Sequence, residues 1–259
     1  MKKFLYSLRT DLYFSAPVSR HTFLLRAFPG HYPFQEPVNA SLTCKPQCKL
    51  AQSTDGFGNS VHQGYIEPWH TGFSFISSGE VITDSSKHDT RPPAPYYALP
   101  SELTKLEGKL ADFYRENKTE GTSAQKLERW LEAVQKGFKY QKGRTTTATT
   151  AAQAFEQGAG VCQDYAHILL SLLRADHLPC RYVAGMLAGE GASHAWIELY
   201  DGREWIAADP THCRLCDDQY LKLSHGTDFA SAPIERGVFI ENGEAVTQSV
   251  QSRALMREI

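Results

Sequence analysis

The segment HAWIELYDGREWIAAD, residues 194–209, predicts a β-hairpin. Asp201-Gly202 lies between two apolar segments, and Asp-Gly favours a two-residue type I′ turn because both central residues need a positive φ. If the turn contains only these two residues, counting outward places His194 directly opposite Asp209. Opposite residues have Cβ atoms about 4.5–5.5 Å apart on one face of the sheet. We therefore expect a hydrogen bond between the imidazole and the carboxylate.

A second segment, GAGVCQDYAHILLSLLRA at residues 158–175, predicts a buried helix that begins near a cysteine. Apolar residues cover nearly the whole circumference of the helix, which is typical of a helix inside a domain. Cys162 falls in the first turn of this helix, shortly after the glycine-rich segment at residues 158–160. Unpaired backbone N–H groups and the positive end of the helix dipole favour a thiolate there.

Together the two segments predict a cysteine-based catalytic site. Cys162 would be the nucleophile, His194 would take and return a proton, and Asp209 would orient the imidazole. The backbone N–H of Cys162 is also suited to stabilise the oxyanion of a tetrahedral intermediate. Taken singly, each residue also fits a structural role: a cysteine as core filler, a histidine as a bonded strand residue, an aspartate before proline as a turn. Their joint arrangement favours catalysis.

The rest of the chain predicts two folded parts. Residues 1–90 contain short aromatic and β-branched segments between turn signals, typical of an all-β sandwich or barrel. Residues 91–100 contain four prolines and predict a stiff linker at a domain boundary. Residues 101–259 predict an α+β domain, because helical patterns are followed by strand patterns. The expected helices cover residues 102–116, 122–137, 151–155 and 161–175, and the expected strands 181–186, 194–200, 203–209, 220–223 and 247–250.

Composition excludes several classes of protein. The 259 residues include 27 Lys+Arg and 29 Asp+Glu, with a net charge of −2 and no basic cluster, which argues against a nucleic-acid partner. No apolar run reaches the roughly 18–20 residues of a membrane helix, so no membrane partner is expected. The apolar stretch after Met1 is too short for the core of a signal peptide. We therefore expect a cytoplasmic protein.

Three motifs resemble those of the transglutaminase-like superfamily of papain-fold cysteine enzymes, in its bacterial branch with an N-terminal β domain. GVCQDYAH (residues 160–167) resembles the nucleophile motif, SHAWIE (193–198) the histidine motif, and WIAADPT (205–211) the aspartate motif. They occur in the order of the family. The resemblance covers roughly residues 100–240, and residues 16–59 resemble the N-terminal region of the family more loosely.

The resemblance implies a papain-like transglutaminase-core α+β domain preceded by an all-β sandwich-like domain. It also implies a triad of Cys162, His194 and Asp209 that forms a thioester with a peptide or protein substrate, without a metal or cofactor. Resolution by water would make the protein a peptide or isopeptide hydrolase, whereas resolution by an amine would make it an acyl transferase. A non-catalytic association module with a vestigial triad is a third alternative. Gln157 and Tyr140 are both candidates for a second oxyanion donor.

The other five cysteines have weaker assignments. The Cys213-x₂-Cys216 pair departs from the usual family pattern, and Cys44 and Cys48 form a second, differently spaced pair. The two pairs could supply four zinc ligands, or each could be redox-active, with a Cys213–Cys216 disulfide acting as a switch beside the aspartate. We favour reduced packing thiols over both alternatives, since a cytoplasmic protein keeps its thiols reduced. Cys180 is predicted to be a core residue.

Overall fold

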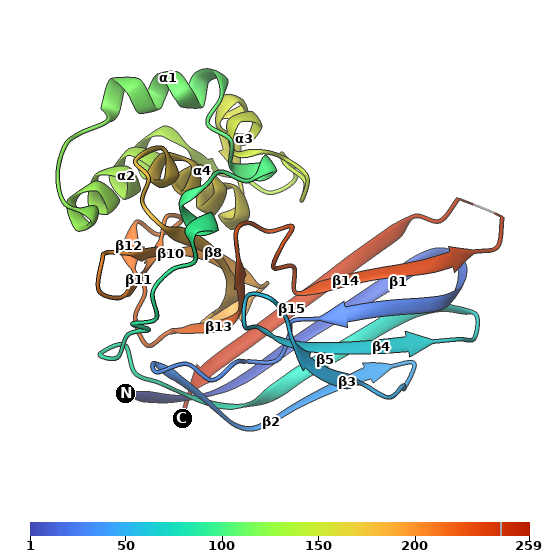
Figure 1. The fold of residues 1–259 in the computed structure, drawn as a ribbon. Helices are drawn as coiled ribbons and strands as arrows, with labels where there is room; N and C mark the ends of the chain where they lie inside the picture. Colours follow the sequence, from blue (N-terminus) through green and yellow to red (C-terminus); the bar gives the residue numbers. More distant parts are fainter. Residues whose placement is uncertain (244) are drawn as a thin grey trace.

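The computed structural model describes residues 1–243 and 245–259 and contains a β part and an α+β part (Figure 1). The helices are η1 (Pro95–Ala98), η2 (Glu102–Thr104), α1 (Gly108–Asn117), α2 (Ser123–Gly137), α3 (Ala151–Gln157) and α4 (Cys162–Ala175). The strands are β1 (Lys2–Leu25), β2 (Gln35–Lys45), β3 (Ala51–Thr54), β4 (Ser60–Ile66), β5 (His70–Thr83), β6 (Lys139–Tyr140), β7 (Ala159–Gly160), β8 (Cys180–Leu187), β9 (Gly189–Gly191), β10 (His194–Tyr200), β11 (Trp205–Asp209), β12 (Arg214–Leu215), β13 (Tyr220–Gly226), β14 (Glu235–Glu241) and β15 (Gln248–Glu258).

The β part is built around one long, bent strand, β1. Its first half pairs with β5 on one edge and β15 on the other, and its second half pairs with β4 and β14. The pairing breaks between Tyr13 and Val18, where Figure 1 shows β1 turning back on itself. The two halves face each other, and Phe23 packs on Phe73 with ring centroids 4.3 Å apart. This arrangement confirms the expected sandwich-like N-terminal part.

The last two strands of the chain belong to this β part and not to the α+β part. β15 pairs with β1 from Phe4 to Phe14, and it buries Ala254 and Met256 in the same core. The predicted catalytic domain of residues 101–259 is therefore wrong at its C-terminal end. The strand pattern was detectable, but a strand pattern does not specify which edge the strand will join.

In the α+β part, helix α4 packs against an antiparallel sheet whose strands differ in length. The sheet order is β12-β11-β10-β8-β13, and α4 lies on β10 and β8 (Figure 1). The apolar side chains of α4 from Ala166 to Leu173 are fully buried, as its all-round apolar pattern predicts. The α+β class is confirmed, and the helix that begins with Cys162 is held firmly by the core.

The predicted helices are correct except for the first. Ser101 caps only the short turn η2, and the chain is extended at Lys105 before α1 begins at Gly108. The single helix predicted over residues 102–116 is therefore wrong. Hydrogen bonds between Ser101 and Thr104 stabilise one helical turn, and the helix does not continue beyond it. Helix α2 has the expected Thr122 capping box.

The proline-rich segment at residues 91–100 connects the two parts and packs against the second. The indole N–H of Trp205 donates to the carbonyl of Arg91 at 2.8 Å. The Arg174 guanidinium donates to the carbonyl of Tyr97, whose side chain is buried. The segment is thus fixed to the α+β part along its length.

A network of buried charges lies where the β part packs on the α+β part. Glu198 on β10 accepts from Lys222 at 2.6 Å and from Arg181 at 2.5 Å, and Arg181 also pairs with Asp89 at 3.1 Å. The backbone of Lys222 exchanges two hydrogen bonds with the side chain of Gln35 on β2. All five residues are at most 4% exposed, so the junction is a satisfied polar network in a dry environment.

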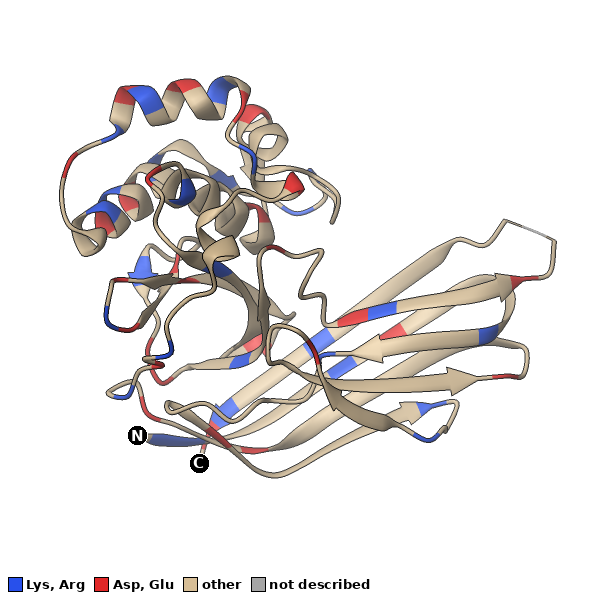
Figure 2. Ribbon diagram, in the orientation of Figure 1, with Lys and Arg blue, Asp and Glu red and all other residues tan. Residues whose placement is uncertain are grey.

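Charged residues elsewhere are scattered. Figure 2 shows Lys and Arg interspersed with Asp and Glu along the helices and strands of both parts. None of the described helices is long and apolar enough to cross a bilayer.

Candidate active site

The candidate nucleophile, Cys162, is the first residue of α4 and is half-buried. Helix α3 ends at Gly158, whose φ of 70° closes the C-terminus, and β7 then leads directly into α4. The Asp164 carboxylate accepts from the N–H of Val161 at 2.7 Å and from the Thr145 hydroxyl at 2.6 Å. These bonds hold the start of the helix, and therefore Cys162, in one orientation.

The position of the Asp164 carboxylate at the start of α4 requires a glycine at residue 160. A Cβ at this position would lie 2.4 Å from Asp164 Oδ2. The close neighbour of this glycine is therefore the capping carboxylate of α4.

His194 and Asp209 are hydrogen-bonded, but not through the predicted pairing. Tyr200 lies opposite Trp205, so the loop holds residues 201–204 and the register differs by two residues from the prediction. The reason is the Asp201 side chain, which accepts from the N–H groups of Arg203 and Glu204 and so closes a longer loop. Because a shift of two residues keeps each side chain on its face, the His194 Nε2 still lies 2.7 Å from Asp209 Oδ2.

The environment favours a protonated His194 and an ionised Asp209. Although burial opposes protonation, the hydrogen bonds with Asp209 and Cys162 raise the pKa of His194 to about 9. Burial disfavours the charge of Asp209, but the hydrogen bond and the charge of His194 outweigh it and hold the pKa of Asp209 well below its usual range. The bond to Asp209 uses Nε2, which leaves Nδ1 as the ring nitrogen for the thiol of Cys162. The three predicted residues are thus brought together.

Two further side chains bind Asp209 and were not predicted. His212 Nδ1 lies 2.7 Å and the Tyr220 hydroxyl 2.8 Å from Asp209 Oδ2. The three-residue spacing of Asp209 and His212 in one turn was a usable signal for the first. The second comes from β13, and only the sheet topology reveals it. With His194, the same oxygen therefore has three side-chain partners.

Around these residues, Trp196 is buried beside His194, with ring centroids 6.2 Å apart, so it screens the imidazole from one side. Tyr140 on β6 pairs in parallel with Gly160 on β7, two residues before Cys162. Burial and the nearby charge of Cys162 raise the pKa of Tyr140. Gln157 ends α3 with an exposed side chain. Tyr140 is thus the better placed of the two predicted oxyanion candidates.

The loop before His194 is held by the β part. Strand β9 pairs with β15, and Glu190 forms an ion pair with Arg253 at 2.7 Å. The pairing makes this segment a fixed bridge from β15 to the candidate site.

The two cysteine pairs do not combine into one metal site. Cys44 and Cys48 pack at the core of the β part, whereas Cys213 and Cys216 pack against two different clusters of the α+β part. Within the described residues, a cluster of at least three candidate ligands is formed by His194, Asp209 and His212. Cys180 is fully buried, as predicted.

Comparisons with known proteins identify the same family as the sequence motifs. Residues 109–210 match the model of the transglutaminase-like superfamily, and residues 6–82 match the bacterial transglutaminase-like N-terminal region. Uncharacterized proteins of Mycobacterium bovis and Mycobacterium tuberculosis are each 36% identical over 200 residues, which cover 69% of this chain. The chain spans 59% of the length of these relatives.

A solved structure shares the fold across both parts. The chain is similar to a proposed cysteine protease from Cytophaga hutchinsonii, with a TM-score of 0.79 and 21% sequence identity. The similarity covers 100% of this chain and 92% of that one. The arrangement of a bent β part and an α+β part is therefore a fold already seen in a crystal.

Proposed function

Because the chain belongs to the transglutaminase-like superfamily, we propose that it is a cysteine-dependent hydrolase that cleaves peptide or isopeptide bonds through a thioester. The observation that carries the proposal is the His194 imidazole, which is hydrogen-bonded to Asp209 and lies against Cys162 at the start of α4. A thiol, an imidazole and a carboxylate in this order are the groups that nucleophilic acyl transfer requires.

In the proposed reaction, the Cys162 thiolate attacks the amide carbonyl, and the N–H groups at the start of α4 stabilise the developing oxyanion. The Tyr140 hydroxyl is a second donor for this oxyanion. Protonated His194 gives its proton to the leaving amine, and the C–N bond breaks to leave a thioester on Cys162. His194 then accepts a proton from the attacking water, and the thiolate leaves as the acid is released.

Asp209 keeps the imidazole in position during both steps. Its carboxylate is fully buried and accepts hydrogen bonds from three side chains, so it is fixed more firmly than a single partner would allow. The carboxylate also stabilises the positive charge on His194, which the first step needs.

The proposal is tested by alkylation and by product analysis. Iodoacetamide near neutral pH should modify Cys162 well before Cys180, whose pKa is raised to about 11 by burial. A library of peptides and isopeptides should then be cleaved by the wild-type chain and not by Cys162→Ala. Cys180→Ser tests whether removal of another thiol leaves cleavage intact.

Three outcomes would contradict the proposal. If Cys162 reacts no faster than Cys180, the thiol is not activated. If an added primary amine appears in the product and raises turnover, the protein is an acyl transferase and not a hydrolase. If Cys162→Ala keeps full biological activity, the protein acts as an association module.

A further inference from the structure

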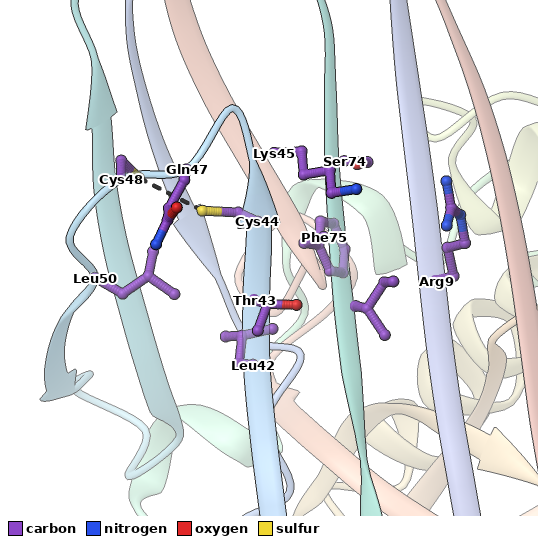
Figure 3. A pocket seen from close by; sticks show the side chains of 11 residues that line it. Arg9, Leu42, Thr43, Cys44, Lys45, Gln47, Cys48, Leu50, Ser74 and Phe75 are labelled. Atoms are coloured by element: carbon purple, nitrogen blue, oxygen red, sulfur yellow. Dashed lines mark hydrogen bonds between the residues drawn. The ribbon is translucent and has the colours of Figure 1, made fainter.

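The thiols of Cys44 and Cys48 lie beside each other in the β part, far along the chain from the candidate active site. Their sulfur atoms are 3.5 Å apart. The dashed line in Figure 3 joins the two side chains. Cys44 lies near the end of β2, and Cys48 lies in the segment that leads to β3. Both line an open pocket of about 460 Å³. The pocket is not lined by Cys162, His194 or Asp209.

We propose that Cys44 and Cys48 are a reversible dithiol–disulfide site that exchanges with a low-molecular-mass disulfide. Closing the bond requires the sulfur atoms to approach by about 1.5 Å, from 3.5 Å to the roughly 2.05 Å of a disulfide. Cys44 is held in the sheet opposite Phe75, whereas residues 46–50 have no strand pairing. The approach therefore needs movement of the Cys48 segment alone.

The chemistry of the pocket favours a redox site over a metal site. Beyond the two thiols, the uncharged polar side chains that line it are those of Thr43, Gln47 and Ser74, and such oxygens are poor partners for a thiophilic ion. The ring between the two cysteines would be short, so the bond would remove little entropy from the unfolded chain. A role as a permanent staple is thus disfavoured.

The pocket also gives an external disulfide access to the pair. Cys48 is partly exposed, whereas Cys44 is 8% exposed, so Cys48 is the residue that an external reagent meets first. Lys45 lines the pocket and contributes positive charge, whereas the charge of Arg9, which also lines it, is paired with that of Asp11. This setting fits an anionic disulfide such as glutathione disulfide.

The exchange proceeds in two balanced steps. The Cys48 thiolate attacks one sulfur of the external disulfide, a mixed disulfide forms, and one thiolate leaves. The Cys44 thiolate then attacks the Cys48 sulfur and releases the second thiolate. The protein loses two electrons and two protons, and the external disulfide is reduced to two thiols.

The environment of Cys48 controls the rate of the exchange. Burial and the hydrogen bond with Cys44 raise the pKa of Cys48 to about 11. Little thiolate is present at neutral pH, so the exchange should be slow there and should accelerate as the pH rises.

Glutathione redox buffers at pH 8, applied to the full chain, test the proposal. After acid quenching, alkylation and trypsin digestion, residues 27–49 form one peptide that holds both cysteines and no others. In oxidising buffer this peptide should lose two hydrogen atoms and resist alkylation. The equilibrium constant for closure should be at least about tenfold larger in the folded chain than in urea.

Variants distinguish formation of the Cys44–Cys48 disulfide from oxidation of a single thiol. Cys44→Ser should accumulate glutathione on Cys48, since the resolving thiol is absent. Cys213 and Cys216 serve as the matched pair: they pack against different clusters, so they should stay alkylatable in the same buffer. Equal closure in folded and urea-unfolded chains would overturn the proposal, and so would full alkylation of Cys44 and Cys48 in oxidising buffer. The folded-versus-unfolded comparison uses wild-type protein and holds even if the serine variant does not fold.

Discussion

Asp209 Oδ2 accepts hydrogen bonds from His194, His212 and Tyr220, and this shared acceptor defines the site at the scale of single residues. The local sequence was sufficient to expect Cys162 at a helix start and His194 beside Asp209, because a helix pattern begins near Cys162 and a hairpin pattern puts the other two residues on one face. Tyr220 could not be predicted, since its contact depends on which strand lies beside which. His212 was visible in the sequence, but it stood next to a cysteine pair that suggested zinc.

The protonation of His194 gives the first prediction. Its folded pKa of about 9 lies above the ordinary value of 6.5, so the interaction stabilises the fold fully below about pH 6.5, and the stabilisation is lost as the pH rises through about 9. An NMR titration of the imidazole should show a midpoint near pH 9. In Asp209→Asn the midpoint should fall by at least about one pH unit, because the counter-charge is gone. A wild-type midpoint near 6.5 would show that the imidazole is not paired.

His212 is a positioning residue for Asp209, and His212→Ala tests this role. We expect cleavage to fall by about three- to tenfold, the equivalent of one hydrogen bond of roughly 1 kcal/mol. The midpoint of the His194 titration should also move to higher pH, since the carboxylate then has fewer donors to share its charge. His31→Ala, in an exposed pair with Glu36, is the matched control and should change neither value. An unchanged His194 midpoint would contradict the positioning role.

At the scale of elements, the hairpin of β10 and β11 shows what a pattern can specify. The alternation of apolar residues fixed the face on which each side chain lies, so His194 and Asp209 were correctly assigned to one face. The loop length depended on side-chain bonds from Asp201, which a dipeptide signal does not include. The same holds for residues 102–116, where bonds between Ser101 and Thr104 end the first turn early.

The start of α4 supplies a prediction at this scale. Gly160→Ala places a methyl group 2.4 Å from Asp164 Oδ2, so the carboxylate must move and its bonds to Val161 and Thr145 weaken. We expect a loss of about 1–3 kcal/mol in the free energy of unfolding and slower alkylation of Cys162. Urea denaturation and iodoacetamide kinetics measure the two effects.

Gly137→Ala is the control for this change, since nothing lies within 4 Å of a Cβ added there at the end of α2. Its unfolding free energy should stay within about 0.5 kcal/mol of the wild-type value. If Gly160→Ala behaves like this control, the cap does not position the nucleophile.

At the scale of the whole molecule, paired buried charges lie where the β part packs on the sheet of the α+β part. Glu198 on β10 and Lys222 on β13 both belong to that sheet. The sequence showed them only as members of predicted strands, because an ion pair between two strands leaves no local pattern. In the structure both are at most 2% exposed and 2.6 Å apart. The junction is thus a feature that only the assembled fold defines.

Lys222→Met should destabilise the protein by about 3 kcal/mol, since Glu198 would keep only Arg181 as a buried cationic partner. The double variant Lys222→Met with Glu198→Gln should recover part of this loss, because the unbalanced charge is removed. Guanidinium denaturation of both variants measures the difference. A Lys222→Met protein that loses less than about 1 kcal/mol would mean that the pair adds little to the junction.

The pairing of β1 with β14 and β15 has a consequence for biosynthesis. A ribosome delivers β1 before β14 and β15, so the edge of β1 that pairs with them stays open while the intervening chain is made. At the usual 5–20 residues per second, that interval is on the order of ten seconds or more. An open, apolar strand edge is prone to pair with other chains. β1 is therefore among the last strands of this chain to complete its pairing, and nascent chains of this protein should depend on a chaperone that shields β1.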